Sequence, residues 1–162
     1  MAKASPIRGI APSAALADNA RGVIVARLSD VLEWAPRGRD EADGASLHNL
    51  RIAVKRLRYA LEFLGPAFGE PAAAYLEQAT ALQEALGMVT DCDAFMRHLA
   101  SHEPQEPGLA HDGWEGLAER LRQRRREQWL ACMRLLDEYD QTAVWARILR
   151  DLCPPPAERL RQ

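Results

Sequence analysis

The sequence predicts an all-α protein, namely an antiparallel up-and-down bundle of four main helices with short extra helices. Apolar residues recur at intervals of three and four along most of the 162-residue chain, and no useful stretch alternates with period two. The connections between the periodic stretches are short, which favours antiparallel neighbours. An apolar fraction of 48% suffices for one core, so we divide the chain into an N-terminal extension (1–12), a helical bundle (13–153) and a flexible tail (154–162).

Sequence signals delimit the first two helices. The first is expected from about Ser13 to Trp34, because a proline and a polar, Gly-containing loop follow it. The second is expected to begin at Ser46, whose hydroxyl can cap a helix N-terminus, and to end before Gly65.

Two more helices are expected in the middle of the chain. Pro71 suits the first turn of a third helix, which is expected to end at Gly87. Asp91 or Thr90 is then expected to cap a short fourth helix that reaches about Ala100.

The C-terminal part is expected to contain an exposed loop, a long helix and a short helix. Two prolines and a glycine favour a loop over 103–113, and the helical periodicity resumes over 114–139. A last helix around 145–152 is expected to end before the three prolines at 154–156.

Charge and cysteine content restrict the class of protein. The formal net charge is -2, so the chain is not the uniformly basic body of a nonspecific nucleic-acid binder. Its three cysteines form no C-x-x-C pair, which favours reduced thiols in a cytosol. No apolar run approaches the roughly 18 to 20 residues that span a bilayer, and no signal-peptide core opens the chain. We therefore expect a cytoplasmic protein without a membrane partner or a cofactor.

Two stripes run side by side through residues 46–64. Leucine and valine recur there every three or four residues, and a second stripe, offset by one position, consists of His48, Arg51, Lys55 and Arg58. On a helix this offset turns the second stripe by about 100°. The cations are therefore expected to form a row beside a packed seam, which suits a ligand that is itself a row of negative charge.

A solvated flank is the alternative interpretation of this stripe, since the methylene groups of long cationic side chains often cover the edge of a core. Against this alternative, the helix has no acidic residue before Glu62, so no neighbouring carboxylate of the helix offsets the repulsion between Arg51 and Lys55. His48 either binds an anion, better when protonated, or bonds a neighbour at the helix start. Tyr59 either orders a bound oxygen or packs its ring with the hydroxyl at the rim.

The stripe resembles the signature of the CHAD domain, the conserved histidine α-helical domain. The pattern His-x-x-Arg-x-x-x-Lys/Arg-Arg-x-Arg is matched by His48, Arg51, Lys55, Arg56 and Arg58. Tyr59 follows directly. Downstream, residues 82–87 read Leu-Gln-Glu-Ala-Leu-Gly and are followed by Asp91, which is similar to the family's Leu-Gln-x-x-Leu-Gly and trailing Asp.

This resemblance implies an all-helical fold that binds inorganic polyphosphate in a basic groove or channel, often at polyphosphate granules and sometimes beside a triphosphate-tunnel domain. The sequence shows no triphosphate-tunnel domain. Family members usually contain two four-helix units, each with a basic helix, whereas this chain has one signature helix. Either the chain pairs with itself as a homodimer, which would bring two basic helices together, or it is a degenerate member with a weaker site. The homodimer is the more economical expectation.

Other candidate residues lie outside the signature. The arginines of 120–126 surround a whole helix, and Arg124 and Arg125 flank its apolar seam, where they could line the same groove or meet solvent. His98 and His102, spaced i,i+4, are either weak candidates for metal ligands or cations that favour a helix C-terminus.

The function expected from these observations is noncatalytic binding of inorganic polyphosphate along a basic groove, with association with polyphosphate granules. The residues expected to bind it are His48, Arg51, Lys55, Arg56, Arg58, Tyr59, Arg124 and Arg125. One alternative is a metal-dependent polyphosphate or nucleotide phosphohydrolase, which needs an acid cluster or an activated nucleophile beside the row. The other is a binder of RNA or another polyanion, which needs aromatic platforms among the cations, where only Tyr59 qualifies.

Overall fold

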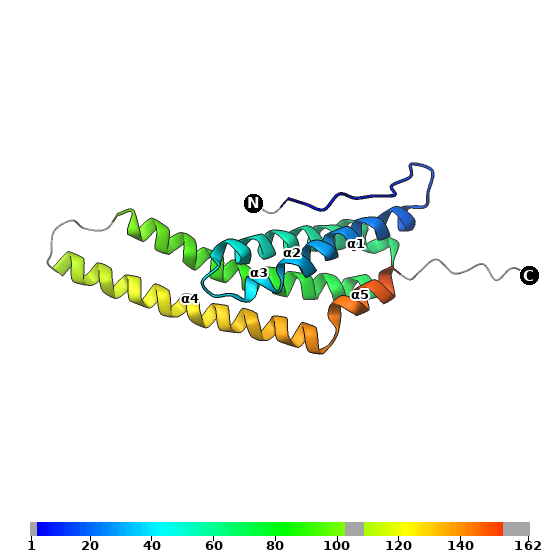
Figure 1. Ribbon diagram of the computed structural model, residues 1–162. Helices are drawn as coiled ribbons and strands as arrows, with labels where there is room; N and C mark the ends of the chain where they lie inside the picture. The colour runs from blue at the N-terminus through cyan, green and yellow to red at the C-terminus, as the bar shows by residue number, and fades with distance from the viewer. Residues whose placement is uncertain (1–2, 103–108, 154–162) are drawn as a thin grey trace, which may run out of the picture.

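The computed structural model describes residues 3–102 and 109–153, which form an all-α fold (Figure 1). Within these residues, five α-helices and two short 3₁₀ helices follow one another. Their bounds are α1 Leu16–Trp34, η1 Arg37–Arg39, α2 Gly44–Leu64, η2 Gly65–Ala67, α3 Glu70–Ala100, α4 Leu109–Gln141 and α5 Val144–Leu152. The predicted all-α class and helical bundle are confirmed.

The four long helices form an up-and-down bundle in which each helix packs on the next one in the sequence. Thus α1 contacts α2, α2 contacts α3 and α3 contacts α4, while α5 turns back to contact α4, α3 and α1. The predicted apolar seam of α2 is buried at Leu47, Leu50, Val54, Leu57 and Leu61. This seam holds the basic stripe of the same helix at the surface beside the core.

The segment before α1 is not helical. The helix begins at Leu16 instead of Ser13, and residues 3–15 lie along it. The backbone N–H of Ser5 donates a hydrogen bond to the buried carboxylate of Asp30 at 2.9 Å, and Arg27 donates to the same carboxylate at 2.9 Å. These contacts tie the N-terminal segment to the bundle.

The N-terminus of α2 lies two residues before the predicted start. Asp43, not Ser46, caps the helix, and its carboxylate accepts a hydrogen bond from the Ser46 N–H at 2.9 Å. Hydrogen bonds from the Ser46 side chain and backbone lower the pKa of the Asp43 carboxyl below its usual value. The prediction of Ser46 as the cap is wrong because Asp43, an equally good capping residue, stands three positions earlier and reaches the Ser46 N–H.

The third and fourth predicted helices are one continuous helix, α3, of 31 residues. Gly87 lies inside it, and the Thr90 hydroxyl donates to the Gly87 carbonyl at 3.0 Å instead of capping a new helix. A glycine in a helix interior costs about 1 kcal/mol relative to alanine. Burial of Leu86 and Val89 on either side offsets this cost, so the predicted break is wrong.

α4 starts earlier than predicted. It begins at Leu109, so the loop expected over 103–113 is wrong for 109–113, where no proline interrupts the helix; residues 103–108 lie outside the described part. Ala143, with φ 52° in the left-handed region, turns the chain from α4 into α5. The predicted tail at 154–162 also lies outside the described residues.

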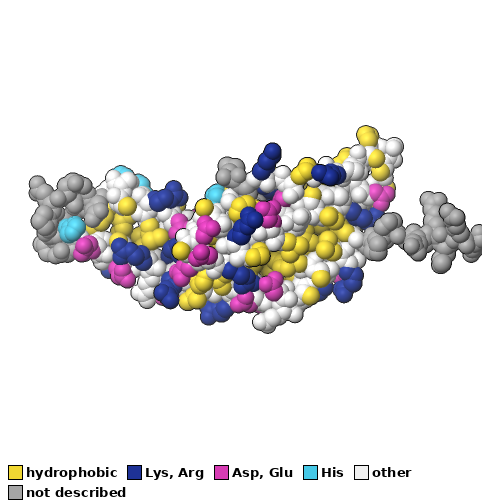
Figure 2. Space-filling view, in the orientation of Figure 1, with side chains coloured by type: hydrophobic (Ala, Val, Ile, Leu, Met, Phe, Trp, Pro, Cys, Tyr) yellow, Lys and Arg dark blue, Asp and Glu magenta, His cyan; other side chains and the backbone are white. Residues whose placement is uncertain are grey.

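The two longest helices extend beyond α1 and α2 as a pair (Figure 1). We call the end of this pair, residues 88–100 of α3 and 111–124 of α4, the arm; the start of α2 still lies beside Thr90 and Asp93. On the face that Figure 2 draws, positive and negative side chains are interspersed and hydrophobic side chains gather over the right half. Among the described residues, no helix combines the length and the apolar character needed to cross a bilayer.

Candidate functional site

The predicted basic row lies on the outer side of α2, beside α3. His48 and Lys55 are exposed, and Arg51 and Arg58 are half-buried against α3. At a rise of about 1.5 Å per residue, the four side chains follow roughly 15 Å of the helix and are spaced about 5 Å apart. We call this row, with the facing edge of α3, the basic groove.

Arg51 occupies the middle of the basic groove and lacks a partner within the described residues. Its Nε is buried and makes no hydrogen bond, and no carboxylate of the described chain pairs with its guanidinium. A Cβ built on Gly87 would lie 3.9 Å from this Nε, so the glycine backbone of α3 forms the surface beneath it. A buried donor without an acceptor is costly, and because no carboxylate of the described residues pairs with the rest of the Arg51 guanidinium, it can pair with an incoming anion.

Arg58 is held in place by two side chains. Its Nε donates to Gln83 Oε1 on α3 at 2.9 Å, and its terminal nitrogen contacts Glu62 at 2.8 Å. The Arg58 guanidinium also lies 4.3 Å from the centroid of the Tyr59 ring, and the Lys55 ammonium lies 5.6 Å from it. Tyr59 thus packs between two cations of the row and restricts where they point.

The charge balance of the basic groove differs from that of other arginines in the protein. Within the described residues, His48, Arg51 and Lys55 form no ion pair, and Glu62 is paired with Arg58 alone. By contrast, Arg39 contacts two aspartates of α4 at 2.5 and 2.7 Å. The row therefore keeps most of its positive charge uncompensated, which is the arrangement expected of a site for anions.

Arg125 binds acidic residues of its own chain. It contacts Asp93 at 2.5 Å and Glu41 at 3.5 Å, and its side chain is only 14% exposed. It also lines a hollow together with His48 at the start of α2. The structure therefore brings Arg125 near one end of the basic groove, where it ties α4 to α3 and to the loop before α2.

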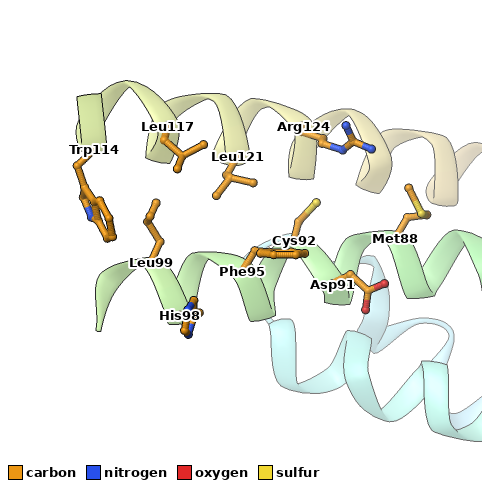
Figure 3. A pocket seen from close by; sticks show the side chains of 10 residues that line it. All are labelled: Met88, Asp91, Cys92, Phe95, His98, Leu99, Trp114, Leu117, Leu121 and Arg124. Atoms are coloured by element: carbon orange, nitrogen blue, oxygen red, sulfur yellow. The ribbon is translucent and has the colours of Figure 1, made fainter. Parts of the chain in front are cut away.

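Arg124 and Arg56 lie away from the groove. Arg124 lines a different hollow between α3 and α4, beside Met88 and Cys92 (Figure 3). Arg56 points to the other flank of α2, where it lines a shallow hollow with Arg27 of α1. The predicted set of eight residues is therefore divided among three surfaces.

The two candidate metal ligands stack on each other near the C-terminus of α3. The ring centroids of His98 and His102 lie 4.4 Å apart, and His102 Nδ1 lies 2.9 Å from the His98 carbonyl oxygen. In the described part of the chain, no group of three or more His, Cys, Asp or Glu side chains is placed to hold a metal ion.

Sequence reasoning gave no role to the α3 side of the groove. Gln83 contacts Arg58, Gly87 lies beside Arg51, and Thr90 lines the same hollow as His48. These three residues are four and three positions apart, so they lie on one face of α3. The Leu-Gln-x-x-Leu-Gly element contained this signal, because its glutamine and glycine lie on one helix face.

The model of the CHAD domain family matches residues 2–100, a range that includes α1, α2 and α3. The matched segment thus contains both sides of the basic groove. No curated protein and no solved structure matched the chain significantly. Because the match covers more than half of the chain, the chain belongs to the CHAD domain family.

Proposed function

We propose that this protein binds inorganic polyphosphate along the basic groove without hydrolysing it. The family is associated with polyphosphate binding, which supports the choice of ligand. The observation that carries the proposal is Arg51: a half-buried cation with an unsatisfied Nε and no carboxylate partner among the described residues. Such a group stabilises the fold less than a paired one would and is suited to an anion that arrives from outside.

The groove matches the chemistry of this ligand. Polyphosphate is a flexible thread with about one negative charge per unit, and its neutralisation by fixed cations releases counterions, as with nucleic acids. Arg51 and Arg58 can each donate two hydrogen bonds to a phosphate, whereas Lys55 acts as a point charge. A row of cations about 5 Å apart contacts successive parts of the thread.

A binding role agrees better with the groove than a hydrolytic one. Hydrolysis of a phosphoanhydride needs a metal-held or base-activated water near the phosphate. Among the described residues, Glu62 beside the row pairs with Arg58 at 2.8 Å, and Asp93, near His48, pairs with Arg125 at 2.5 Å. Glu62 therefore orients a cation rather than a nucleophile.

RNA is a second candidate ligand, favoured by one observation. Phe63 is 77% exposed and Tyr59 is 40% exposed, and their ring centroids lie 6.4 Å apart at one end of the row. Exposed rings beside cations are platforms on which bases stack. If RNA is the ligand, Phe63→Ala weakens RNA binding; if polyphosphate is, the same change leaves its affinity unaltered.

The direct test compares two double variants with the same change in charge. We expect Arg51→Ala/Lys55→Ala to weaken binding of long-chain polyphosphate about tenfold or more, and to reduce its salt dependence by roughly one to two units of slope. The matched control, Arg122→Ala/Arg126→Ala, removes two exposed arginines of α4 and should change affinity little. Equal losses in both variants would show that net charge, not the groove, determines binding.

The same titration separates the alternatives. It is performed in chelator, with RNA as competitor, and phosphate release is measured in parallel with added Mg²⁺ or Mn²⁺. Binding that persists in chelator without phosphate release is expected. Metal-dependent release would contradict the noncatalytic role, and displacement of polyphosphate by equal amounts of RNA would favour the second candidate. Localisation to polyphosphate granules is part of the proposal and should be lost in Arg51→Ala/Lys55→Ala.

A further inference from the structure

A second surface of the molecule, on the arm, has the opposite character. A hollow of about 590 Å³, which we call the arm groove, lies between α3 and α4 and is lined mostly by large apolar side chains (Figure 3). Those of them that are more than a third exposed are Phe95, at 64%, Met88, at 41%, and Leu117, at 39%. Cys92, Leu99, Trp114 and Leu121 complete its apolar wall.

This groove is uncovered because of the architecture of the bundle. The start of α2 lies beside Thr90 and Asp93, on another face of α3, and the residues that line the groove all come from α3 and α4. Two antiparallel helices bury only the seam between them, and the outer edges of that seam stay in water. A contiguous patch of large exposed apolar side chains on a protein of this size marks an interaction site.

We propose that the arm groove binds the arm of a second copy of this chain, which gives a two-fold symmetric homodimer with a four-helix arrangement at the contact. In a symmetric contact, the same patch is used twice, so it must be complementary to itself. A groove with apolar walls on both helices satisfies this condition, because α3 of one copy can pack on α4 of the other and the reverse.

Two charged residues at the groove support a second copy as the occupant. Asp91 of α3 and Arg124 of α4 both line it and lie on opposite helices near the Met88 end (Figure 3). Both are exposed, and within the described residues neither forms an ion pair. When α3 packs on α4 of the second copy, Asp91 meets Arg124 of that copy, and the symmetry forms this pair twice.

The experiment measures self-association of the full chain by sedimentation equilibrium. The wild-type chain should show twice its own mass, and Phe95→Glu should raise the dissociation constant about 30-fold or more, because it buries a charge at the centre of the contact. The matched control is Phe63→Glu: Phe63 is even more exposed, at 77%, but lies on α2 outside the groove. It should leave the dimer intact.

A charge swap tests the proposed pairing. Asp91→Arg and Arg124→Asp should each weaken the dimer roughly threefold to tenfold, since each places like charges opposite one another, and the combined variant should restore it. Circular dichroism checks that each variant keeps its helices. A monomeric wild-type chain, equal dissociation by Phe63→Glu, or additive losses in the combined variant would each overturn the proposal. None of these readouts depends on polyphosphate binding.

Discussion

The flank of α3 toward α2 and the flank toward α4 differ in the kind of binding partner that each could take. On the flank toward α2, Gln83 orients Arg58, which pairs with Glu62, whereas Arg51 has an unsatisfied Nε and no carboxylate partner among the described residues. On the flank toward α4, the arm displays Phe95 and Leu117 and lacks an apolar cover. One helix thus separates a surface suited to an anion from a surface suited to another protein.

One helix can therefore contribute to two different surfaces, because its residues fall on separate faces. Gln83, Gly87 and Thr90 follow one face of α3, and Met88 and Phe95 follow another. Each face keeps the three-and-four periodicity of a helix. Changes on one flank should therefore leave the other undisturbed, and this independence can be tested.

The largest effect is expected from reversing a charge on one flank. Arg51→Glu should weaken polyphosphate binding about 30-fold or more, because it removes bidentate contacts and adds repulsion. Arg124→Glu, the same change on the other flank, should leave polyphosphate affinity within about twofold while weakening self-association. Binding titrations and sedimentation of both variants measure the four outcomes. Comparable loss of polyphosphate affinity in both would show that the two flanks form a single site.

A somewhat smaller effect is expected from covering the floor of the basic groove. Gly87→Gln should lower polyphosphate affinity roughly fivefold, because its side chain extends over the space beside Arg51. Gly87→Ala is the control: its Cβ would lie 3.9 Å from Arg51 Nε, an ordinary contact, so binding should persist. The alanine should also raise the melting temperature slightly, since glycine disfavours a helix interior. Unchanged affinity in Gly87→Gln would show that the ligand does not approach α3.

The sequence alone predicted those features of the fold and of the candidate site that depend on a single helix. The burial of Leu50 and Leu57 and the row formed by Arg51 and Arg58 follow from residue spacing within α2. The family resemblance rested on the same segment. Local periodicity therefore accounts for both the core face and the ligand face of the helix that carries the signature.

What the sequence could not show depends on contacts between helices. Gly87 was expected to end a helix, yet packing on both sides continues α3 through it to Ala100. Arg125 resembled Arg124 in sequence, but Asp93 and Glu41 bind the one, whereas the other lies by the arm groove. Which of two neighbouring arginines meets a carboxylate is set by tertiary structure, and no periodicity reveals it.

A moderate effect is expected at the residue that orients Arg58. Gln83→Leu removes the acceptor of the Arg58 Nε bond and should weaken polyphosphate binding about threefold, because the guanidinium loses its fixed direction. Gln123→Leu is the control, since Gln123 lies on the surface of α4. The polyphosphate affinity of both variants is measured by titration. An equal loss of affinity in both variants would show that removing any exposed amide side chain has this effect, independently of Arg58.

The smallest effect is expected at the N-terminal end of the row. His48 is exposed there, and a ring nitrogen can donate a hydrogen bond to an anion. His48→Gln should therefore weaken polyphosphate binding roughly twofold, measured by titration. Self-association of the arm serves as the comparison, because it should not respond to His48→Gln. Unchanged polyphosphate affinity in His48→Gln would show that the ligand does not reach this end of the row.

The central claim is that polyphosphate lies along α2 and contacts α3. An NMR titration of the isotope-labelled chain with polyphosphate tests it most directly. The largest chemical-shift changes should follow His48, Arg51, Lys55 and Arg58, with smaller changes at Gln83 and Thr90. Changes centred on the arginines at 120–126 of α4, with α2 unaffected, would contradict it.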